Sequence, residues 1–285
     1  MGNPWIVQFL HPGGEHEPDQ PDRRSWNRHN HQRTFLRCPG AYVGSQGTIL
    51  RESVVFWGEW EPPVRVLRRY QNVLPGLPRY ICEPYLTVPS AFCEHQNTDP
   101  FVFGDRFLYA ICQQHTSKGP SALQRLERGS LILFGSHKSR QFHLDTVFVV
   151  SESADHDAES YRDNLRGRVA SLYVTVALDP WYASVGRNSG PRSRGRLYFG
   201  ATPADPVEGM FSFFPCLPEL QAPSGFVRPP IRLSDHISDR LTQKWQGTLV
   251  ADLATAREAW DEVARQVQSA KLELGVHADL PRISP

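Results

Sequence analysis

The chain has 285 residues with 31 Lys+Arg against 30 Asp+Glu, so it has no global charge that would steer it onto nucleic acid, although a local basic face stays open. No apolar run approaches the roughly 20 residues of a membrane helix, and the N-terminus lacks the features of a secretion signal. The five cysteines are widely spaced without a CxxC pair, which favours reduced thiols in a cytoplasm over a disulfide framework.

The first predicted strand covers 5–10, and a long polar stretch over 11–34 follows it. That stretch carries His, Pro, Gly, Asp, Arg and Asn, which is the composition of a loop. Long ordered loops inside a folded chain often carry function. Further strands are expected at 53–58, 64–70 and 85–88, before a second irregular stretch over 89–106.

The middle of the chain has the strongest strand signal. After an expected strand at 107–112, two runs rich in β formers at 131–134 and 142–150 predict a hairpin. The charged residues 151–167 are typical of a short helix or a surface loop. More strands are expected at 169–178, 196–200 and 209–214.

A C-terminal helix is predicted within 252–271, where apolar residues recur at every third and fourth position and Asp252 is a candidate N-cap. We expect one domain over 1–285: an irregular N-terminal site region (1–106), a β core (107–214), and a Pro-rich link with the helix (215–285). The predicted class is α+β, with a curled antiparallel sheet or small barrel, long loops and a C-terminal helix.

The loop after the first strand contains His11-Pro-Gly-Gly-Glu-His16. Two imidazoles and a carboxylate lie close in sequence, and the Gly pair lets the backbone turn sharply. We expect His11, Glu15 and His16 to form a catalytic cluster that activates water. Metal binding by His11 and His16, with zinc as the metal, is an alternative, and so is a polar loop whose histidines bond backbone carbonyls.

Four arginines follow in the same polar stretch. They are candidate contacts to DNA phosphates, because guanidinium groups pair well with phosphate oxygens. These residues are Arg23, Arg24, Arg28 and Arg33. An ordinary solvated loop is the alternative interpretation.

The sequence Trp57-Gly-Glu-Trp-Glu61 lies at the end of a predicted strand. Strand alternation places Trp57, Glu59 and Glu61 on one face. A carboxylate there could accept from the N–H edge of a guanine-like base while Trp57 or Trp60 stacks on the ring. One carboxylate could instead have a raised pKa for proton transfer. An aromatic ladder with exposed glutamates is the structural alternative.

Three other positions are candidates. Asn97 and Asp99 could bind substrate or fix their loop through turns. Cys93, close to His95, is a candidate catalytic nucleophile or a structural thiol. Asp145 lies inside a predicted strand and needs a partner if it is buried, so it is either a structural bond-former or a pocket residue. Walker, GxGxxG and GxSxG motifs are absent from the sequence, which sets aside nucleotide hydrolysis and Rossmann chemistry.

The sequence Leu123-x-x-Leu-x-x-Gly-Ser-Leu-Ile-Leu-Phe134 resembles the strand entry of PUA-like domains of the ASCH and EVE group. This resemblance covers about 107–150. It implies a small β-barrel that holds a modified or flipped base.

A wider set of motifs, over about 5–280, resembles the DpdC proteins of bacterial 7-deazaguanine DNA-modification clusters. The motifs are Phe9–His16, Phe56–Pro62, Asn97–Gly104, Gly129–Gly135, Leu144–Val150 and Phe199–Pro203. The resemblance implies an enzyme that hydrates the nitrile of 7-cyano-7-deazaguanine in DNA to the amide, and it carries over no catalytic residues. The cysteine pattern places such an enzyme in the cytoplasm. This hypothesis predicts one polar pocket that joins 11–16 to 57–61. A non-catalytic reader of modified nucleic acid and a scaffold subunit of a modification or defence system stay open as alternatives.

Overall fold

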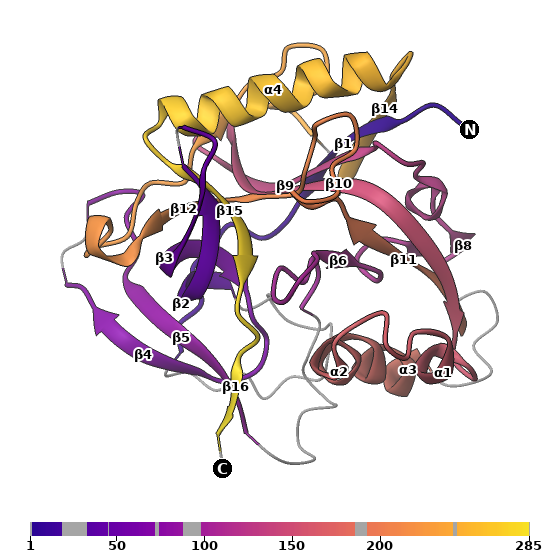
Figure 1. Ribbon diagram of the computed structural model, residues 1–285, viewed down its shortest axis with the longest axis horizontal. Coiled ribbons are helices and arrows are strands. Elements are labelled where there is room, and N and C mark those ends of the chain that lie inside the picture. Colours follow the sequence, from indigo (N-terminus) through magenta and orange to yellow (C-terminus); the bar gives the residue numbers. More distant parts are fainter. Residues whose placement is uncertain are drawn as a thin grey trace.

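Two curled sheets make up most of the structure (Figure 1). The computed structural model describes residues 2–18, 33–44, 46–71, 74–87, 98–185, 193–241 and 244–284. Strands predominate there, and the longest helix is the C-terminal one, so the predicted β-rich α+β class is confirmed. No helix among these residues has both the length and the apolar character needed to cross a bilayer.

The first sheet has the strand order β14-β1-β9-β10-β11-β6, with β13 beside β10. β1 runs parallel to β9 and the other pairs are antiparallel, so the sheet is mixed and not purely antiparallel. Its strands are β1 (Trp5–Leu10), β6 (Leu108–Tyr109), β9 (Leu131–Lys138), β10 (Gln141–Asp157), β11 (Arg194–Gly200), β13 (Pro230–Ile231) and β14 (Trp245–Leu249). The predicted strand at 5–10 and the predicted β9–β10 hairpin are confirmed.

The second sheet has the order β15-β12-β3-β2-β5-β16, with β4 beside β5. β15 also pairs with β2, so β2, β3, β12 and β15 close on themselves as a small curled unit. Its strands are β2 (Arg33–Val43), β3 (Ile49–Glu59), β4 (Val64–Arg69), β5 (Tyr80–Thr87), β12 (Phe214–Pro218), β15 (Glu273–Ala278) and β16 (Arg282–Ser284). The sheet was expected to be antiparallel, but β5 runs parallel to β2 and β16.

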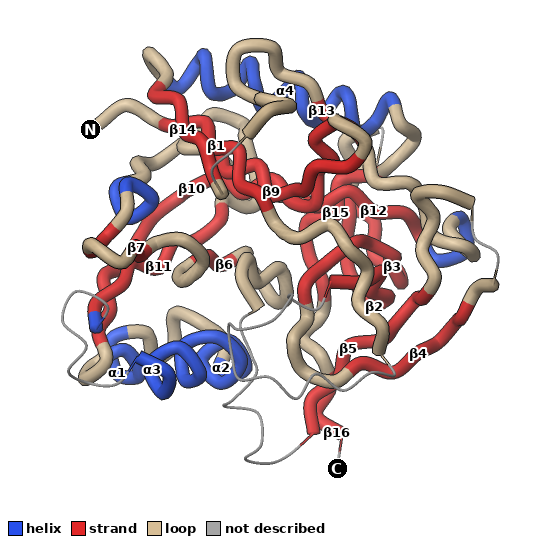
Figure 2. The backbone as a smooth tube through the Cα atoms, turned by 180° about the vertical axis from the view of Figure 1, so that it is seen from behind, coloured by secondary structure: helices blue, strands red, loops and turns tan. Residues whose placement is uncertain are grey.

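The helices gather at opposite ends of the molecule. Figure 2 shows α1, α2 and α3 side by side at one end, while α4 crosses the other. The helical elements are η2 (Ala122–Arg125), α1 (Tyr161–Asn164), α2 (Ser171–Tyr173), η3 (Val174–Leu178), α3 (Asp179–Val185), η5 (Glu219–Gln221) and α4 (Leu253–Ser269). A short two-stranded sheet of β7 (His115–Thr116) and β8 (Gly119–Pro120) lies near η2.

α4 forms as its sequence pattern predicts. Asp252 caps it by accepting a hydrogen bond from the backbone N–H of Thr255 at 2.8 Å. Its apolar residues are buried on one face, and the indole N–H of Trp260 donates to the carbonyl of Phe211 at 2.8 Å. The amphipathic pattern therefore indicated both the helix and the face that packs.

Several predicted elements are wrong. The predicted strand at 169–178 is helical, because its Val-rich sequence buries Tyr173, Val176 and Ala177 at helical spacing. Residues 151–157 continue β10 instead of forming a helix or loop. Of the predicted strand at 209–214, only Phe214 belongs to β12, while Met210 and Phe213 form isolated β-bridges ahead of it.

The sequence also gave no sign of most of β2. Pro39-Gly40 interrupts the strand pattern of the sequence, although the strand itself continues through both residues. Gly40 lets the β15 backbone approach, because a side chain there would clash with the carbonyl of His277.

Candidate functional site

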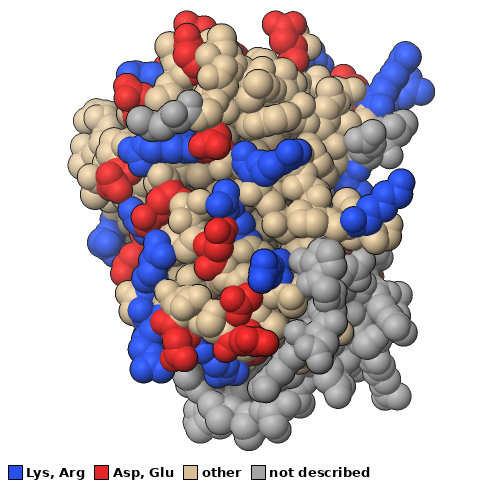
Figure 3. Space-filling view, turned by 90° about the vertical axis from the view of Figure 1, so that its right-hand side faces the viewer, with Lys and Arg blue, Asp and Glu red and all other residues tan. Residues whose placement is uncertain are grey.

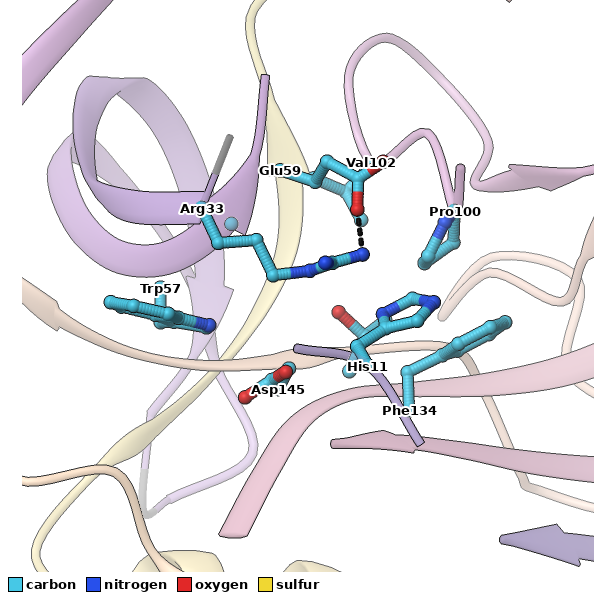
Figure 4. A pocket seen from close by; sticks show the side chains of 10 residues that line it. His11, Arg33, Trp57, Glu59, Pro100, Val102, Phe134 and Asp145 are labelled. Atoms are coloured by element: carbon cyan, nitrogen blue, oxygen red, sulfur yellow. Dashed lines mark hydrogen bonds and ion pairs between the residues drawn. The ribbon is translucent and has the colours of Figure 1, made fainter. Parts of the chain in front are cut away.

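A small cavity lies between the two sheets, where the end of β1 and interior residues of β9 and β10 face β2 and β3 (Figure 4). Its volume is about 10 Å³, which is room for roughly one water molecule. The lining residues are His11, Arg33, Trp57, Gly58, Glu59, Pro100, Val102, Phe134, Asp145 and Thr146.

The cavity joins the two sequence segments that were expected to meet. His11 follows β1, while Trp57 and Glu59 alternate on β3 and therefore point to the same face. Asp145 enters from β10. The predicted juxtaposition of 11–16 with 57–61 is thus present for His11, Trp57 and Glu59.

Arg33 is the first residue of β2 and Glu59 is the last residue of β3. The two residues are partners in the sheet and form a buried ion pair. Their side chains are 2% and 3% exposed. Burial lowers the pKa of Arg33 to about 10, with the charge of Asp145 opposing that shift, so the guanidinium remains charged at neutral pH. Arg33 was expected to contact DNA phosphates from a surface loop. Its buried position beside Glu59 makes it a wall of the cavity instead.

Asp145 has the partner that a buried carboxylate requires. Its Oδ1 accepts from Nη1 of Arg228 at 2.6 Å, and both side chains are 7% exposed. Burial raises the pKa of Asp145, while the charges of Arg228 and Arg33 oppose that rise. Its second oxygen, Oδ2, is buried and has no hydrogen-bond partner among the described residues. Asp145 is therefore both a structural bond-former and a cavity residue.

Two buried donors line the same cavity. Within the described part of the chain, Nη1 of Arg33 and the indole Nε1 of Trp57 have no hydrogen-bond acceptor. The Arg228 guanidinium lies over the Trp57 ring, 4.3 Å from its centroid. Buried polar atoms are nearly always satisfied in folded proteins, so two donors and the Asp145 acceptor around one small space indicate a polar guest.

His11 contributes an imidazole to the wall opposite Trp57 (Figure 4). Its ring stacks on Phe134 at 5.2 Å, and its backbone N–H donates to the carbonyl of Gly135 at 2.7 Å. His16 is not a lining residue of the cavity, and its backbone N–H donates to the carbonyl of Arg33 at 2.8 Å. In the described ranges no three His, Cys, Asp or Glu side chains are placed to hold a metal. These residues therefore do not supply the ligands that zinc binding by His11 and His16 would need.

Glu15 does not join His11 at the cavity. Its carboxylate accepts from the backbone N–H groups of Arg79 and Tyr80 at 2.9–3.0 Å and pairs with the Arg79 side chain. These bonds fasten the loop to the start of β5. The expected cluster of His11, Glu15 and His16 is therefore corrected to His11 alone.

Trp60 and Asp99 are structural residues in this fold, although both were expected to bind substrate. Trp60 is 1% exposed, and its indole N–H donates to the carbonyls of Pro63 and Tyr85 at 3.2 Å. Asp99 is fully buried and accepts from the backbone N–H groups of residues 110–112 at 2.6–3.1 Å. Burial raises the pKa of Asp99 to about 6 against those bonds. This is the loop-fixing role that was the alternative for Asp99.

Glu61 is buried but is not a lining residue of the cavity, and its backbone N–H donates to Thr98 Oγ1 at 3.2 Å. Other predicted site residues lie outside the described residues. These are Arg23, Arg24, Arg28, Cys93 and Asn97. Their predicted roles stay predictions.

One face of the surface carries charges of both signs (Figure 3). On the face in Figure 3, acidic and basic side chains are interspersed over the described residues. Among the described residues, charges of opposite sign also form ion pairs, such as Arg106 with Glu152 and Asp205. No one-sign field for a phosphate backbone is visible among the described residues on this face.

Sequence reasoning missed Arg228 and Ser136. Arg228 stands before Pro229 in the segment interpreted as a Pro-rich link, and an arginine there carries no sequence signal for burial. Ser136 was expected in the short loop between the two strands of the hairpin, whereas β9 continues through it to Lys138.

No protein-family model, curated protein or solved structure matches this chain. The resemblances to DpdC proteins and to PUA-like domains therefore stay predictions.

Proposed function

We propose that this chain hydrates the nitrile of 7-cyano-7-deazaguanine in DNA to the amide, and that the cavity holds the attacking water. The observation that carries the proposal is a water-sized cavity bounded by one buried carboxylate oxygen and two buried N–H donors, none with a partner among the described residues. A buried water needs two to four polar partners, and this set provides three. Hydration is a reaction in which water itself is a substrate.

Asp145 is the general base in this proposal. Its Oδ2 takes a proton from the water while the water oxygen bonds to the nitrile carbon and one carbon–nitrogen π bond breaks. Burial raises the pKa of Asp145, which makes the carboxylate a better proton acceptor. The salt bridge to Arg228 uses the other oxygen, so pairing does not consume the reactive one.

Arg33 and His11 on the opposite wall stabilise and protonate the nitrogen of the nitrile. Negative charge develops there as water adds, and the Arg33 guanidinium is a buried cation on the same cavity. His11 supplies the proton that this nitrogen takes up, and the proton that Asp145 took from the water passes to His11 as the product leaves, which restores both groups. The imidic acid formed then tautomerises to the amide, so that one water is added overall and no oxidant or reductant is needed.

The cavity has room for about one water and not for a base, since pockets for ligands of that size measure roughly 300–1,000 Å³. The ring of the base therefore stays outside these walls, and the nitrile meets the water at the edge of the cavity. Recognition of the base is not assigned to Glu59, because its carboxylate is paired with Arg33.

The test is to incubate the protein with a duplex and a single-stranded oligonucleotide that carry the cyano base. Mass spectrometry of the released nucleoside then measures the gain of one water. An oligonucleotide with guanine at the same position is the control for specificity. Binding without any mass change would overturn the enzyme and favour the non-catalytic reader. Absence of both binding and turnover would leave a scaffold role.

Two variants test the assignment of the site. Asp145→Asn removes the base while keeping the shape, and it is expected to lower turnover by about 10²–10⁴-fold. Trp57→Phe removes one N–H donor but keeps a ring under Arg228, and a smaller loss is expected. If Asp145→Asn folds and retains full turnover, the assignment of Asp145 is wrong.

A further inference from the structure

We infer that Arg228 is the positioning residue of this site: one buried guanidinium sets the general-base carboxylate, the Trp57 wall and the loop that carries His11. The inference rests on the proposed function for its catalytic meaning. The geometry that carries it is independent of that function, because it comes from hydrogen bonds to three separate segments of the chain and a cation–π contact with a fourth.

The guanidinium of Arg228 has a partner on each side. Nη1 donates to Asp145 Oδ1 on β10 at 2.6 Å and to Ser136 Oγ on β9 at 2.8 Å. Nη2 donates to the carbonyl of Gly13, two residues after His11, at 3.3 Å. The guanidinium also lies over the Trp57 ring on β3. Arg228 therefore ties both sheets to the loop after β1.

The backbone around Arg228 is itself fixed to β10. Its carbonyl is 2.9 Å from Nδ1 of His143, and the N–H of Leu144 donates to the carbonyl of Pro229 at 3.0 Å. β13 then pairs with Phe142 and His143. The side chain thus starts from an anchored segment, and little conformational freedom is left to the guanidinium.

The bond from Arg228 decides which oxygen of Asp145 faces the cavity. With Oδ1 held by Nη1, the carboxylate plane is set and Oδ2 is left for the guest. A planar guanidinium donates in several fixed directions and also stacks on an indole ring, whereas a lysine ammonium is a point charge. We therefore expect that lysine at 228 keeps the charge but loses the geometry.

The experiment compares Arg228→Lys and Arg228→Met with Arg232→Lys, a matched control at an exposed arginine four residues along the same segment. Three readouts are taken for each folded protein: kcat and KM on the cyano oligonucleotide, the pH dependence of kcat, and hydrogen exchange of residues 11–16. Arg228→Lys is expected to lower kcat by about 10²-fold with a smaller change in KM. Hydrogen exchange in the loop should become faster, while Arg232→Lys should match the wild type.

The pH profile separates positioning from mere stabilisation. Charged and titratable groups that face Asp145 or share its cavity are Arg228, Arg33, His143, His11 and Glu59. Removing the positive charge in Arg228→Met should move the acidic limb of the kcat profile to higher pH, and Arg228→Lys should leave it in place. A purely structural role would reduce the amount of folded protein and move neither limb.

The outcomes distinguish the two proposals. If the wild type does not hydrate the nitrile, the proposed function fails, and faster exchange of 11–16 in Arg228→Lys still establishes the positioning of the loop. If the wild type is active and Arg228→Lys retains its kcat and its exchange pattern, the inference about Arg228 is overturned.

Discussion

Gly13 and Gly14 offer a test of how tightly the His11 loop packs against β9. A Cβ added at Gly13 would lie 2.7 Å from Ser136 Oγ and 2.9 Å from Ser136 Cβ, whereas a Cβ added at Gly14 would meet nothing within 4 Å. Gly13→Ala and Gly14→Ala are therefore the same chemical change at adjacent positions, and the structure predicts opposite consequences.

The magnitude for Gly13→Ala follows from that overlap. Carbon atoms pack at about 3.5–4.0 Å, so the methyl group is roughly 0.6–1 Å too close to Ser136. Ser136 is short and accepts from Arg228, so it cannot swing away without losing that bond. Overpacking of this kind costs about 1–3 kcal/mol of unfolding free energy. From the usual unfolding entropy per residue, a chain of this length loses roughly 2 °C of Tm for each kcal/mol.

The assay is thermal unfolding of the wild type and both variants, followed by circular dichroism. Gly13→Ala should lower Tm by about 2–6 °C and also lower turnover, because the carbonyl that Arg228 holds must move. Gly14→Ala should change the unfolding free energy by no more than about 0.5 kcal/mol. Equal Tm values for the two variants would refute the account of close packing at Gly13.

Three other predictions concern stability. Asp99→Asn should lower the unfolding free energy by about 1–3 kcal/mol in urea titrations, because its amide N–H group faces backbone donors, and the exposed Asp105→Asn is the control. Burial lowers the pKa of His156 from 6.5 to about 4. Between these two pH values the unfolded chain binds a proton that the folded chain does not. The free energy of unfolding should therefore fall by up to about 3 kcal/mol as the pH is lowered from 6.5 to 4. Urea titrations of His156→Gln at several pH values should show a flatter dependence there. Asp252→Ala should lower Tm measurably because it removes the N-cap of α4. Two controls should leave Tm unchanged: Asp252→Asn, which still caps the helix, and Glu258→Ala on the exposed face of α4.

Local pattern predicted the elements whose stability is local. The helical period and cap of α4, and the β formers of the β9–β10 hairpin, are both contained in a short stretch of sequence. The Val-rich stretch of η3 fits a strand or a buried helix equally well, and only packing around Tyr173 decides. β2 was missed although its main partner, β3, follows it directly, because Pro39-Gly40 breaks the local strand pattern. Its second partner, β15, lies more than 200 residues away and is outside any local window.

The site residues also divide into those that local sequence predicts and those that it does not. Trp57 and Glu59 could be placed on one face because strand alternation is local, and His11 because it follows a strand. Arg228 could not be found, since its burial is created by the pairing of β13 with β10. Glu15 was misassigned because its proximity to His11 in sequence says nothing about its bond to Arg79 in space.

A loss of activity in Asp145→Asn can come from loss of the base or from loss of stability, because Asp145 is paired with Arg228. Removing one partner of a buried ion pair leaves the other charge uncompensated and costs about 3–5 kcal/mol, so the single variant is expected to lose stability as well as its base. The double variant Asp145→Asn with Arg228→Met removes both charges and should recover much of that stability. If the carboxylate acts chemically, urea unfolding will show the recovery while turnover stays at the level of Asp145→Asn. Recovery of turnover together with stability would mean that Asp145 only holds the fold.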